Sequence, residues 1–297
     1  MPSRVPFYFV DVFATGPLTG NPLSLVPDAD GLDEAQMRAI AREFNQSETT
    51  FVLRPSLPGA TVRLRSFTPA GAEVGGAGHN ALGAWLWMAA AGRLASPAAG
   101  RGVRQEIAGQ VLPVEVAREA GLPAVVWMDQ SPPYFGEVAG DRAGLAVCLG
   151  LDERDLVPGE DAQVVSTGAG HLLVPAGDRD AVDRAVPDPA RLVRALRQVG
   201  AEGCYLYSPD PVDAAAVAYA RFFNPALGIA EDPATGTAAG PLAARLVATG
   251  RVPDESTVVI QQGYAVGRPS RITVSVFGQR VRVGGSGLVV AEGTLTV

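Results

Sequence analysis

The stretch Glu231-Asp232-Pro233-Ala234-Thr235-Gly236-Thr237-Ala238-Ala239-Gly240-Pro241-Leu242 decides the fold that we expect for this chain. Its first residues predict a tight acidic turn that opens a helix, because Asp and Thr are favoured at helix N-termini. The residues that follow, as far as Val247, are nearly all apolar, so we expect a buried helix that ends at Gly250. The free N–H groups and the positive dipole end of such a helix would bind an anion, such as a carboxylate or a phosphate.

A second stretch of the same kind lies about half a chain earlier. Gly75-Gly76-Ala77-Gly78-His79-Asn80-Ala81-Leu82 also runs from a glycine-rich turn into an apolar helix, which we expect to end at Gly92. The interval from His79 to Gly92 equals the interval from Thr237 to Gly250. The two stretches therefore predict two buried helices of similar length.

Other short patterns recur in the same order around the two helices. Phe-x-Pro precedes each helix, at Phe67–Pro69 and Phe223–Pro225, and a Thr-Gly pair opens each half, at Thr15-Gly16 and Thr167-Gly168. We interpret these repeats as an internal duplication that gives two similar α/β halves, each with a central helix. A cleft between the halves would bring the two helix starts together. The alternative is chance matching of short glycine and proline patterns.

Composition limits the class of protein. The chain has 297 residues, enough for two domains, and 47% hydrophobic with 19% charged residues is typical of a soluble globular protein. A net charge of −7 argues against nucleic acid or an anionic membrane as a partner. No apolar run reaches spanning length and the N-terminus lacks the apolar core of a signal peptide, so we expect a cytoplasmic protein.

Several kinds of site find no support in the sequence. Two cysteines, Cys148 and Cys204, and two histidines, His79 and His171, offer little from which to build a zinc site. No phosphate-binding Gly-x-x-x-x-Gly-Lys motif, no Gly-x-Gly-x-x-Gly after the first strand and no Gly-x-Ser-x-Gly elbow occurs. We therefore expect no metal and no nucleotide cofactor.

Two residues, Glu48 and His79, could transfer a proton near the start of the first predicted central helix. Glu48 directly precedes the β-branched and apolar run Thr49–Leu53, so it is expected to be drawn inward, and burial of a carboxyl raises its pKa. A raised pKa suits a general acid or base near neutral pH. His79 stands at the start of the helix, where the dipole favours its neutral form. The alternatives are a Glu at a strand entrance that faces water and a helix-start His without chemistry.

Caps and turns set the remaining boundaries. Asp33 and Gln36 predict a capping box, with Asn45 ending that helix in the left-handed conformation. Asp188 followed by Pro189 predicts a second surface helix, which Gly200 ends. Met128–Pro133 reads as a hinge, so we place the first half at residues 1–128 and the second at 129–285.

The ordered set of motifs resembles the PhzF family of phenazine biosynthesis, and the resemblance covers nearly the whole chain. The motifs that carry it are Gly20-Asn21-Pro22, Ala41-Arg42-Glu43-Phe44-Asn45-Gln46-Ser47-Glu48-Thr49-Thr50-Phe51, Phe67-Thr68-Pro69 with Glu73, Gly78-His79, the Glu231–Leu242 stretch and Gly267-Arg268-Pro269-Ser270.

The resemblance implies an α/β (α+β) fold similar to diaminopimelate epimerase. It has two pseudo-symmetric domains, each a rolled, mostly antiparallel sheet around a central helix, with the active site in the cleft. A C-terminal strand at about residues 286–297 would return to the first half. The implied activity is isomerisation of trans-2,3-dihydro-3-hydroxyanthranilate without a cofactor, in a homodimer that binds a small anionic substrate.

The resemblance also assigns residues. Glu48 would move the proton, while His79 and Asp232 would support the transfer and hold polar groups of the substrate. The substrate carboxylate would bind at four further residues, which are Ser47, Gly78, Gly236 and Thr237.

This chain departs from the family pattern at three places. Thr237 replaces the usual Ser, Gly75-Gly76-Ala77 replaces a bulkier stretch, and Asn80 replaces a Pro or Ala. These changes leave open another isomerase or epimerase of an amino or hydroxy acid, or a binding protein that kept the cleft. Related epimerases carry a thiol at each helix start, whereas Cys148 and Cys204 lie elsewhere, so a two-thiol mechanism is not expected.

Overall fold

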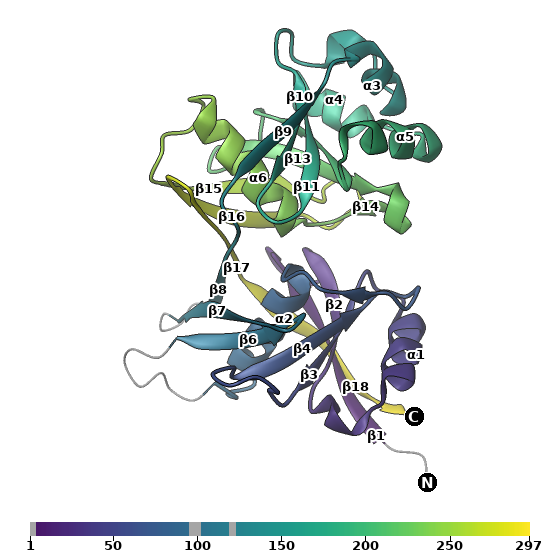
Figure 1. The fold of residues 1–297 in the computed structure, drawn as a ribbon, viewed down its shortest axis with the longest axis vertical. Coiled ribbons are helices and arrows are strands. Elements are labelled where there is room, and N and C mark those ends of the chain that lie inside the picture. The colour runs from purple at the N-terminus through teal and green to yellow at the C-terminus, as the bar shows by residue number, and fades with distance from the viewer. Residues whose placement is uncertain (1–3, 95–101, 119–122) are drawn as a thin grey trace. The chain divides into compact units, whose positions relative to one another are not determined.

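The computed structural model describes residues 4–94, 102–118 and 123–297. Contacts divide the chain into two compact units (Figure 1). Unit 1 comprises residues 1–128 together with 284–297, and unit 2 comprises residues 129–283. The last strand of the chain is therefore part of the unit that contains the first strand.

The described residues of unit 1 form a sheet with the helices α1 (Glu34–Phe44) and α2 (His79–Ala90) and the 3-10 turn η1 (Ala29–Gly31). Its strands are β1 (Arg4–Val12), β2 (Asn21–Val26), β3 (Thr49–Leu53), β4 (Val62–Phe67), β5 (Glu73–Val74), β6 (Val103–Ile107), β7 (Gln110–Ala117), β8 (Val125–Asp129) and β18 (Gly287–Thr296).

The pairing of these strands is mostly antiparallel. Strands β18, β1 and β2 form an antiparallel set, and β2 then pairs in parallel with β3. Strand β4 is antiparallel to β3 and to the short β5, and parallel to β6. Strands β6, β7 and β8 complete the sheet as an antiparallel meander.

Unit 2 contains α3 (Arg142–Cys148), α4 (Arg179–Arg184), α5 (Pro189–Val199) and α6 (Gly236–Ala248), with the 3-10 turns η2 (Glu153–Asp155) and η3 (Pro225–Leu227). Its strands are β9 (Tyr134–Ala139), β10 (Ala162–Ser166), β11 (Gly170–Pro175), β12 (Gly203–Ser208), β13 (Ala218–Asn224), β14 (Ile229–Asp232), β15 (Ser256–Gln262), β16 (Ser270–Phe277) and β17 (Arg280–Gly285), whose last two residues belong to unit 1.

Unit 2 repeats the pairing pattern of unit 1. Strands β9, β10 and β11 are antiparallel, and β11 pairs in parallel with β12. Strand β13 is antiparallel to β12 and to the short β14, and parallel to β15, which is antiparallel to β16. The same order of parallel and antiparallel pairs in both units is the structural counterpart of the duplicated motifs.

Each unit is organised around one buried helix. Every residue of α2 from His79 to Ala89 is buried, and α2 contacts β1, β2, β3 and β18 (Figure 1). Helix α6 is likewise buried along most of its length and contacts β10, β11 and β16. A helix that is apolar on all sides is stable only inside a core, which is why the sheet of each unit surrounds it.

The surface helices follow the predicted caps. Asp33 and Gln36 form the capping box of α1, and Asn45 ends α1 with a left-handed φ of 51°. Asp188 accepts a hydrogen bond from the Arg191 N–H at the start of α5, and Gly200 ends that helix with a φ of 69°.

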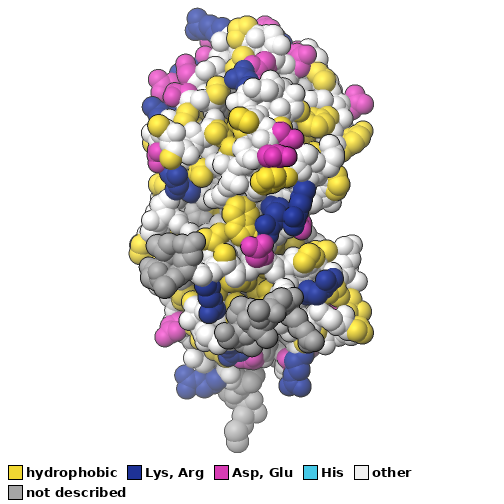
Figure 2. Space-filling model, turned by 90° about the vertical axis from the view of Figure 1, so that its left-hand side faces the viewer, with side chains coloured by type: hydrophobic (Ala, Val, Ile, Leu, Met, Phe, Trp, Pro, Cys, Tyr) yellow, Lys and Arg dark blue, Asp and Glu magenta, His cyan; other side chains and the backbone are white. Residues whose placement is uncertain are grey.

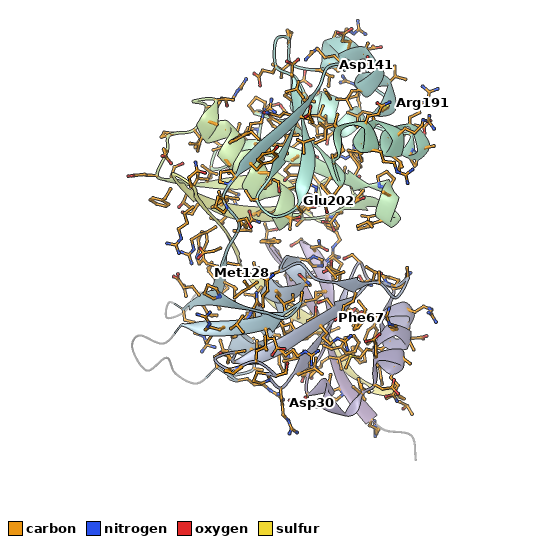
Figure 3. All side chains as sticks on the ribbon, in the orientation of Figure 1. Asp30, Phe67, Met128, Asp141, Arg191 and Glu202 are labelled. Atoms are coloured by element: carbon orange, nitrogen blue, oxygen red, sulfur yellow. The ribbon has the colours of Figure 1, made fainter. Side chains whose placement is uncertain are left out.

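Helix α1 covers a small apolar core of unit 1. This core includes Met37 and Ile40 of α1, together with Phe51 and Phe67 from the sheet. Phe67 lies on β4 beside α1 (Figure 3), and its ring is 5.0 Å from the guanidinium carbon of Arg38. The contact fastens α1 to the strand that leads to the glycine-rich turn.

Three local features were not predicted or were predicted wrongly. Strand β9 and helix α4 were not predicted from the sequence. The Glu231-Asp232 segment is not a tight turn but the end of β14, where Asp232 pairs with Phe222 of β13. Helix α6 begins at Gly236, with Thr235 as its N-cap residue.

Charged groups are mixed on the visible surface. Figure 2 shows acidic and basic side chains interspersed on the face that it draws, and no histidine. Both histidines are in fact buried, with 9% of His79 and 3% of His171 exposed.

Among the residues that the structure describes, no helix is long and apolar enough to cross a membrane.

Candidate active site

Unit 1 brings Ser47, Glu48 and His79 together. The buried strand β3 begins at Thr49, so Glu48 is held at its entrance, and His79 is the first residue of α2. The Nδ1 atom of His79 is 3.8 Å from Oε2 of Glu48, and its Nε2 atom is 3.4 Å from Oγ of Ser47. The two ring nitrogens thus face different neighbours.

The imidazole of His79 is neutral at ordinary pH. Burial lowers the pKa of His79 from its usual 6.5 to about 4, because the charged form loses its hydration. A distance of 3.8 Å to Glu48 is too long for a hydrogen bond in this state. His79 therefore lies beside the Glu48 carboxyl as a neutral polar group, not as the cation of an ion pair.

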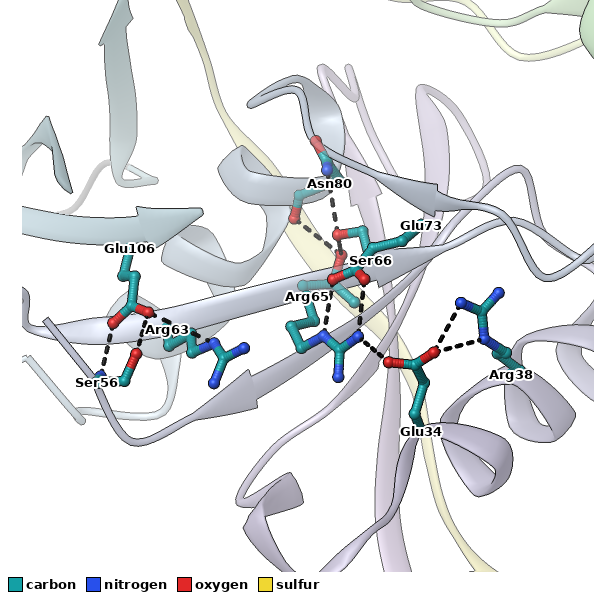
Figure 4. Close-up of polar contacts among 10 residues, drawn as sticks. Glu34, Arg38, Ser56, Arg63, Arg65, Ser66, Glu73, Asn80 and Glu106 are labelled. Atoms are coloured by element: carbon teal, nitrogen blue, oxygen red, sulfur yellow. Dashed lines mark hydrogen bonds and ion pairs between the residues drawn. The ribbon is translucent and has the colours of Figure 1, made fainter. Parts of the chain in front are cut away.

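The glycine-rich turn of unit 1 is fastened by Asn80. Its Oδ1 accepts a hydrogen bond of 2.7 Å from the Gly78 N–H, and its Nδ2 donates to the Gly76 carbonyl. Nδ2 also donates to Oγ of Ser66 (Figure 4). Oγ of Ser66 is in turn 2.9 Å from Oγ1 of Thr50. The side chain of Asn80, one of the departures from the family pattern, thus occupies the Gly78 N–H that was predicted to bind the carboxylate.

The other end of this turn is fixed by an ion pair. Arg65 of β4 donates two hydrogen bonds to Glu73, each 2.7 Å long, and a third to Glu34 of α1 (Figure 4). The hydrogen bond from Arg65 lowers the pKa of Glu73, so this carboxylate stays charged. Residues 75–78 are therefore held between two anchored positions.

In unit 2, Asp232 lies in a buried polar cluster. Thr235 donates its hydroxyl to Oδ2 of Asp232, and Gln262 accepts a hydrogen bond from the Thr235 N–H. Gln262 also donates to the Asp232 carbonyl at 2.7 Å. Thr235 is the N-cap residue of α6, but its hydroxyl binds Asp232, so no side-chain hydrogen bond caps the helix. This contact fixes the orientation of the Asp232 carboxyl.

The first turn of α6 contains Gly236 and Thr237. Within the described part of unit 2, neither of their backbone N–H groups donates to a protein acceptor. The Gly236 carbonyl accepts a hydrogen bond from Gln130, which itself accepts one from the hydroxyl of Thr167. Together with the helix dipole, the two N–H groups suit an anion.

Thr237 is also paired with a residue that the sequence did not single out. Its Oγ1 lies 3.2 Å from Nε2 of His171, on β11. The ring of His171 packs edge-to-face on Phe222, with ring centres 4.9 Å apart. A histidine inside the apolar run His171–Val174 was the available signal, since polar groups in such a run need a partner.

The predicted residues therefore form two groups. Ser47, Glu48, Gly78 and His79 belong to unit 1, whereas the other three, Asp232, Gly236 and Thr237, belong to unit 2. The two thiols are elsewhere, with Cys148 at the end of α3 and Cys204 on β12, and both are free.

The family model for phenazine biosynthesis-like proteins, PhzC-PhzF, matches residues 10–293. The chain belongs to the PhzF family.

Two curated relatives support an enzymatic role for this PhzF-family chain. It is 34% identical over 298 residues to the trans-2,3-dihydro-3-hydroxyanthranilate isomerase of Pseudomonas fluorescens, covering 98% of this chain and 99% of that protein. It is 36% identical over 278 residues to an uncharacterised isomerase, YddE, of Salmonella typhimurium, covering 91% of this chain and 89% of that protein. The chain is thus an isomerase of the PhzF family.

Solved structures confirm the predicted fold. A PhzF-family phenazine biosynthesis protein of Bacillus anthracis aligns with a TM-score of 0.92 at 28% identity, over 99% of this chain and 100% of that one. A hydroxyproline epimerase of Agrobacterium vitis aligns with a TM-score of 0.63 at 13% identity, over 99% of this chain and 93% of the epimerase. At 13% identity, the second alignment shows only that this epimerase has the same fold.

Proposed function

We propose that this isomerase acts on trans-2,3-dihydro-3-hydroxyanthranilate by moving one proton with Glu48. The observation that carries the proposal is the half-buried Glu48 beside the neutral imidazole of His79, at the start of the buried helix of unit 1. Identity of 34% along nearly the whole length of the Pseudomonas fluorescens enzyme supports the choice of substrate.

In this mechanism the Glu48 carboxylate takes a proton from one ring carbon, and the electron pair of that C–H bond moves into the conjugated system. Glu48, now protonated, returns the proton to another ring carbon, so that atoms and electrons balance and the enol formed becomes a ketone. Because the reaction is a proton shift without net oxidation, it needs no redox cofactor. His79 supports the transfer as a neutral imidazole beside Glu48 that can hydrogen-bond a polar group of the substrate.

The remaining residues bind the substrate. Asp232, held by Thr235, would accept hydrogen bonds from the amino or hydroxyl group. Gly236 and Thr237 would bind the carboxylate with their N–H groups at the start of α6, and Ser47 would donate its hydroxyl. Gly78 would contribute only if the Asn80 side chain gave up its hydrogen bond to that N–H.

The direct test is incubation of the purified protein with trans-2,3-dihydro-3-hydroxyanthranilate, followed by NMR and by absorbance. Disappearance of the substrate with formation of the ketone and its condensation products is the expected result. Absence of turnover, in protein shown to be folded by circular dichroism, would contradict this substrate.

A second candidate is isomerisation or epimerisation of another amino or hydroxy acid by the same base. It is favoured by two departures at this turn: the Asn80 side chain occupies the Gly78 N–H, and Gly75-Gly76-Ala77 stands where bulkier side chains are usual. A panel of cyclic amino and hydroxy acids in deuterated water separates the candidates, because any substrate of this base exchanges a carbon-bound proton.

The family resemblance also leads us to propose a homodimer, which light scattering of the purified protein would test.

A further inference from the structure

We propose that His171 is a positioning residue, which fixes the Thr237 hydroxyl as a hydrogen-bond donor to the carboxylate of the substrate. The inference rests on the proposed function for the identity of that carboxylate. It starts from the 3.2 Å contact between Nε2 of His171 and Oγ1 of Thr237.

The position of the imidazole proton decides which atom donates in this contact. The Nδ1 atom of His171 is buried and has no hydrogen-bond partner among the described residues. A buried N–H without an acceptor is rarer in proteins than a buried acceptor without a donor. The proton therefore belongs on Nε2, where it is donated to Oγ1 of Thr237.

The imidazole is also neutral, so it carries a single proton. Only 3% of His171 is exposed, and burial lowers its pKa to about 4. The neutral ring leaves no positive charge to hold an anion by itself. Its contribution is directional, through the one hydroxyl that it contacts.

Accepting a hydrogen bond from His171 leaves the Thr237 hydroxyl proton free for another acceptor. A hydroxyl has one proton and two lone pairs, so occupation of a lone pair by the imidazole directs the proton elsewhere. The adjacent N–H groups of Gly236 and Thr237 are also donors without protein acceptors in the described part of unit 2. Three donors at one helix start match the two oxygens of a carboxylate.

The ring of His171 is held in place by its surroundings. It packs edge-to-face on Phe222, at 84° between the ring planes, and lies on the buried strand β11. The first turn of α6 is fixed from another direction, because Gln130 donates to the Gly236 carbonyl. Both partners of the His171–Thr237 contact are thus preorganised before a ligand arrives.

The first experiment examines the imidazole itself and needs no substrate. The chain has two histidines, so the side-chain nitrogen NMR signals of the full protein can be assigned by comparison with His171→Gln. The expected result at pH 7 is a neutral His171 with its proton on Nε2, and a shift of the Nε2 signal in Thr237→Val. A proton on Nδ1, or a charged ring, would overturn the proposal.

The second experiment compares two amide substitutions by enzyme kinetics. A Gln side chain places its amide near Nε2 of the histidine, whereas an Asn side chain places it near Nδ1. We expect His171→Asn to raise KM by about ten- to hundred-fold, the contribution of one hydrogen bond to a charged group. His171→Gln should restore most of the affinity, with a smaller effect of either change on kcat.

A double-substitution cycle separates this role from a structural one. If His171 acts through Thr237, His171→Asn should have little further effect on KM in the Thr237→Val background. Equal effects of Asn and Gln, or full additivity with Thr237→Val, would show that His171 only supports the fold. If the proposed reaction is not observed, each variant can instead be titrated with 3-hydroxyanthranilate, an aromatic analogue that cannot undergo the proton shift. The dissociation constants then replace KM in the same comparison of variants.

Discussion

Lowering the pH from 7 to 5 should destabilise the protein through its two buried histidines. Burial lowers the pKa of both His79 and His171 from 6.5 to about 4. Between these pH values the unfolded chain binds protons that the folded chain does not, so the free energy of unfolding falls as the pH falls. The effect is absent above about pH 7 and complete below about pH 4.

The magnitude follows from the two pKa values. At pH 5 an unfolded histidine with a pKa of 6.5 is almost fully protonated, whereas the folded one is almost fully neutral. Each histidine therefore lowers the free energy of unfolding by about 2 kcal/mol between pH 7 and pH 5, and both together lower it by about 4 kcal/mol. Carboxylates such as Glu73, whose pKa is lowered by Arg65, lose their contribution only at more acidic pH.

Urea unfolding at pH 7, 6 and 5 measures this dependence, and tryptophan fluorescence locates it. Trp85, Trp87 and Trp127 all belong to unit 1, which contains His79, whereas circular dichroism reports on both units. His79→Gln should abolish the loss of stability at pH 5 that fluorescence reports, and His171→Gln should reduce the loss of stability that circular dichroism reports. A flat profile in the wild type, or an unchanged loss in the double variant, would refute the reasoning.

Three substitutions test the packing around the two candidate groups. Asn80→Ala removes the side chain that fastens residues 76–78, and should lower the free energy of unfolding by about 1–3 kcal/mol in urea unfolding monitored by tryptophan fluorescence; unchanged stability would mean that these hydrogen bonds contribute little. Arg221→Met removes a buried guanidinium that binds Glu231 and three backbone carbonyls, and should cost about 3–5 kcal/mol by circular dichroism, while Arg197→Met on the surface of α5 serves as the control. Gly240→Ala places a Cβ atom against Oε1 of Gln130, so it should displace Gln130 from Thr167 and cost about 1–3 kcal/mol; a cost below about 0.5 kcal/mol would show that the cluster adapts.

The fold was predictable because its signals are local and repeated. Apolar residues on all sides of the segments after His79 and Gly236 specify buried helices, and the caps at Asp33, Asn45 and Gly200 specify where surface helices begin and end. The duplicated order of these signals implies two similar units, and the pairing of strands in the structure has the same duplication.

The site was less predictable because its contacts join distant segments. Ser47 and Glu48 are close to His79 in the folded unit although they are 32 and 31 positions apart in the sequence. The contact of His171 with Thr237 spans 66 positions and depends on the packing of α6 against β11, which no local pattern specifies. The Asp232 segment was read as a turn because acidic residues favour turns, but pairing with β13 outweighs that preference.

The most direct test of the central claim is the fate of the transferred proton in wild type and in Glu48→Gln. Both proteins are incubated with trans-2,3-dihydro-3-hydroxyanthranilate in deuterated water, and deuterium at the ring carbons is followed by NMR. We predict that the wild type forms product with the original proton partly retained, as a single carboxyl shuttle requires. Glu48→Gln should remain folded and lose turnover by several orders of magnitude, about 10³-fold or more. Turnover at the wild-type rate in Glu48→Gln would contradict the assignment of Glu48 as the base.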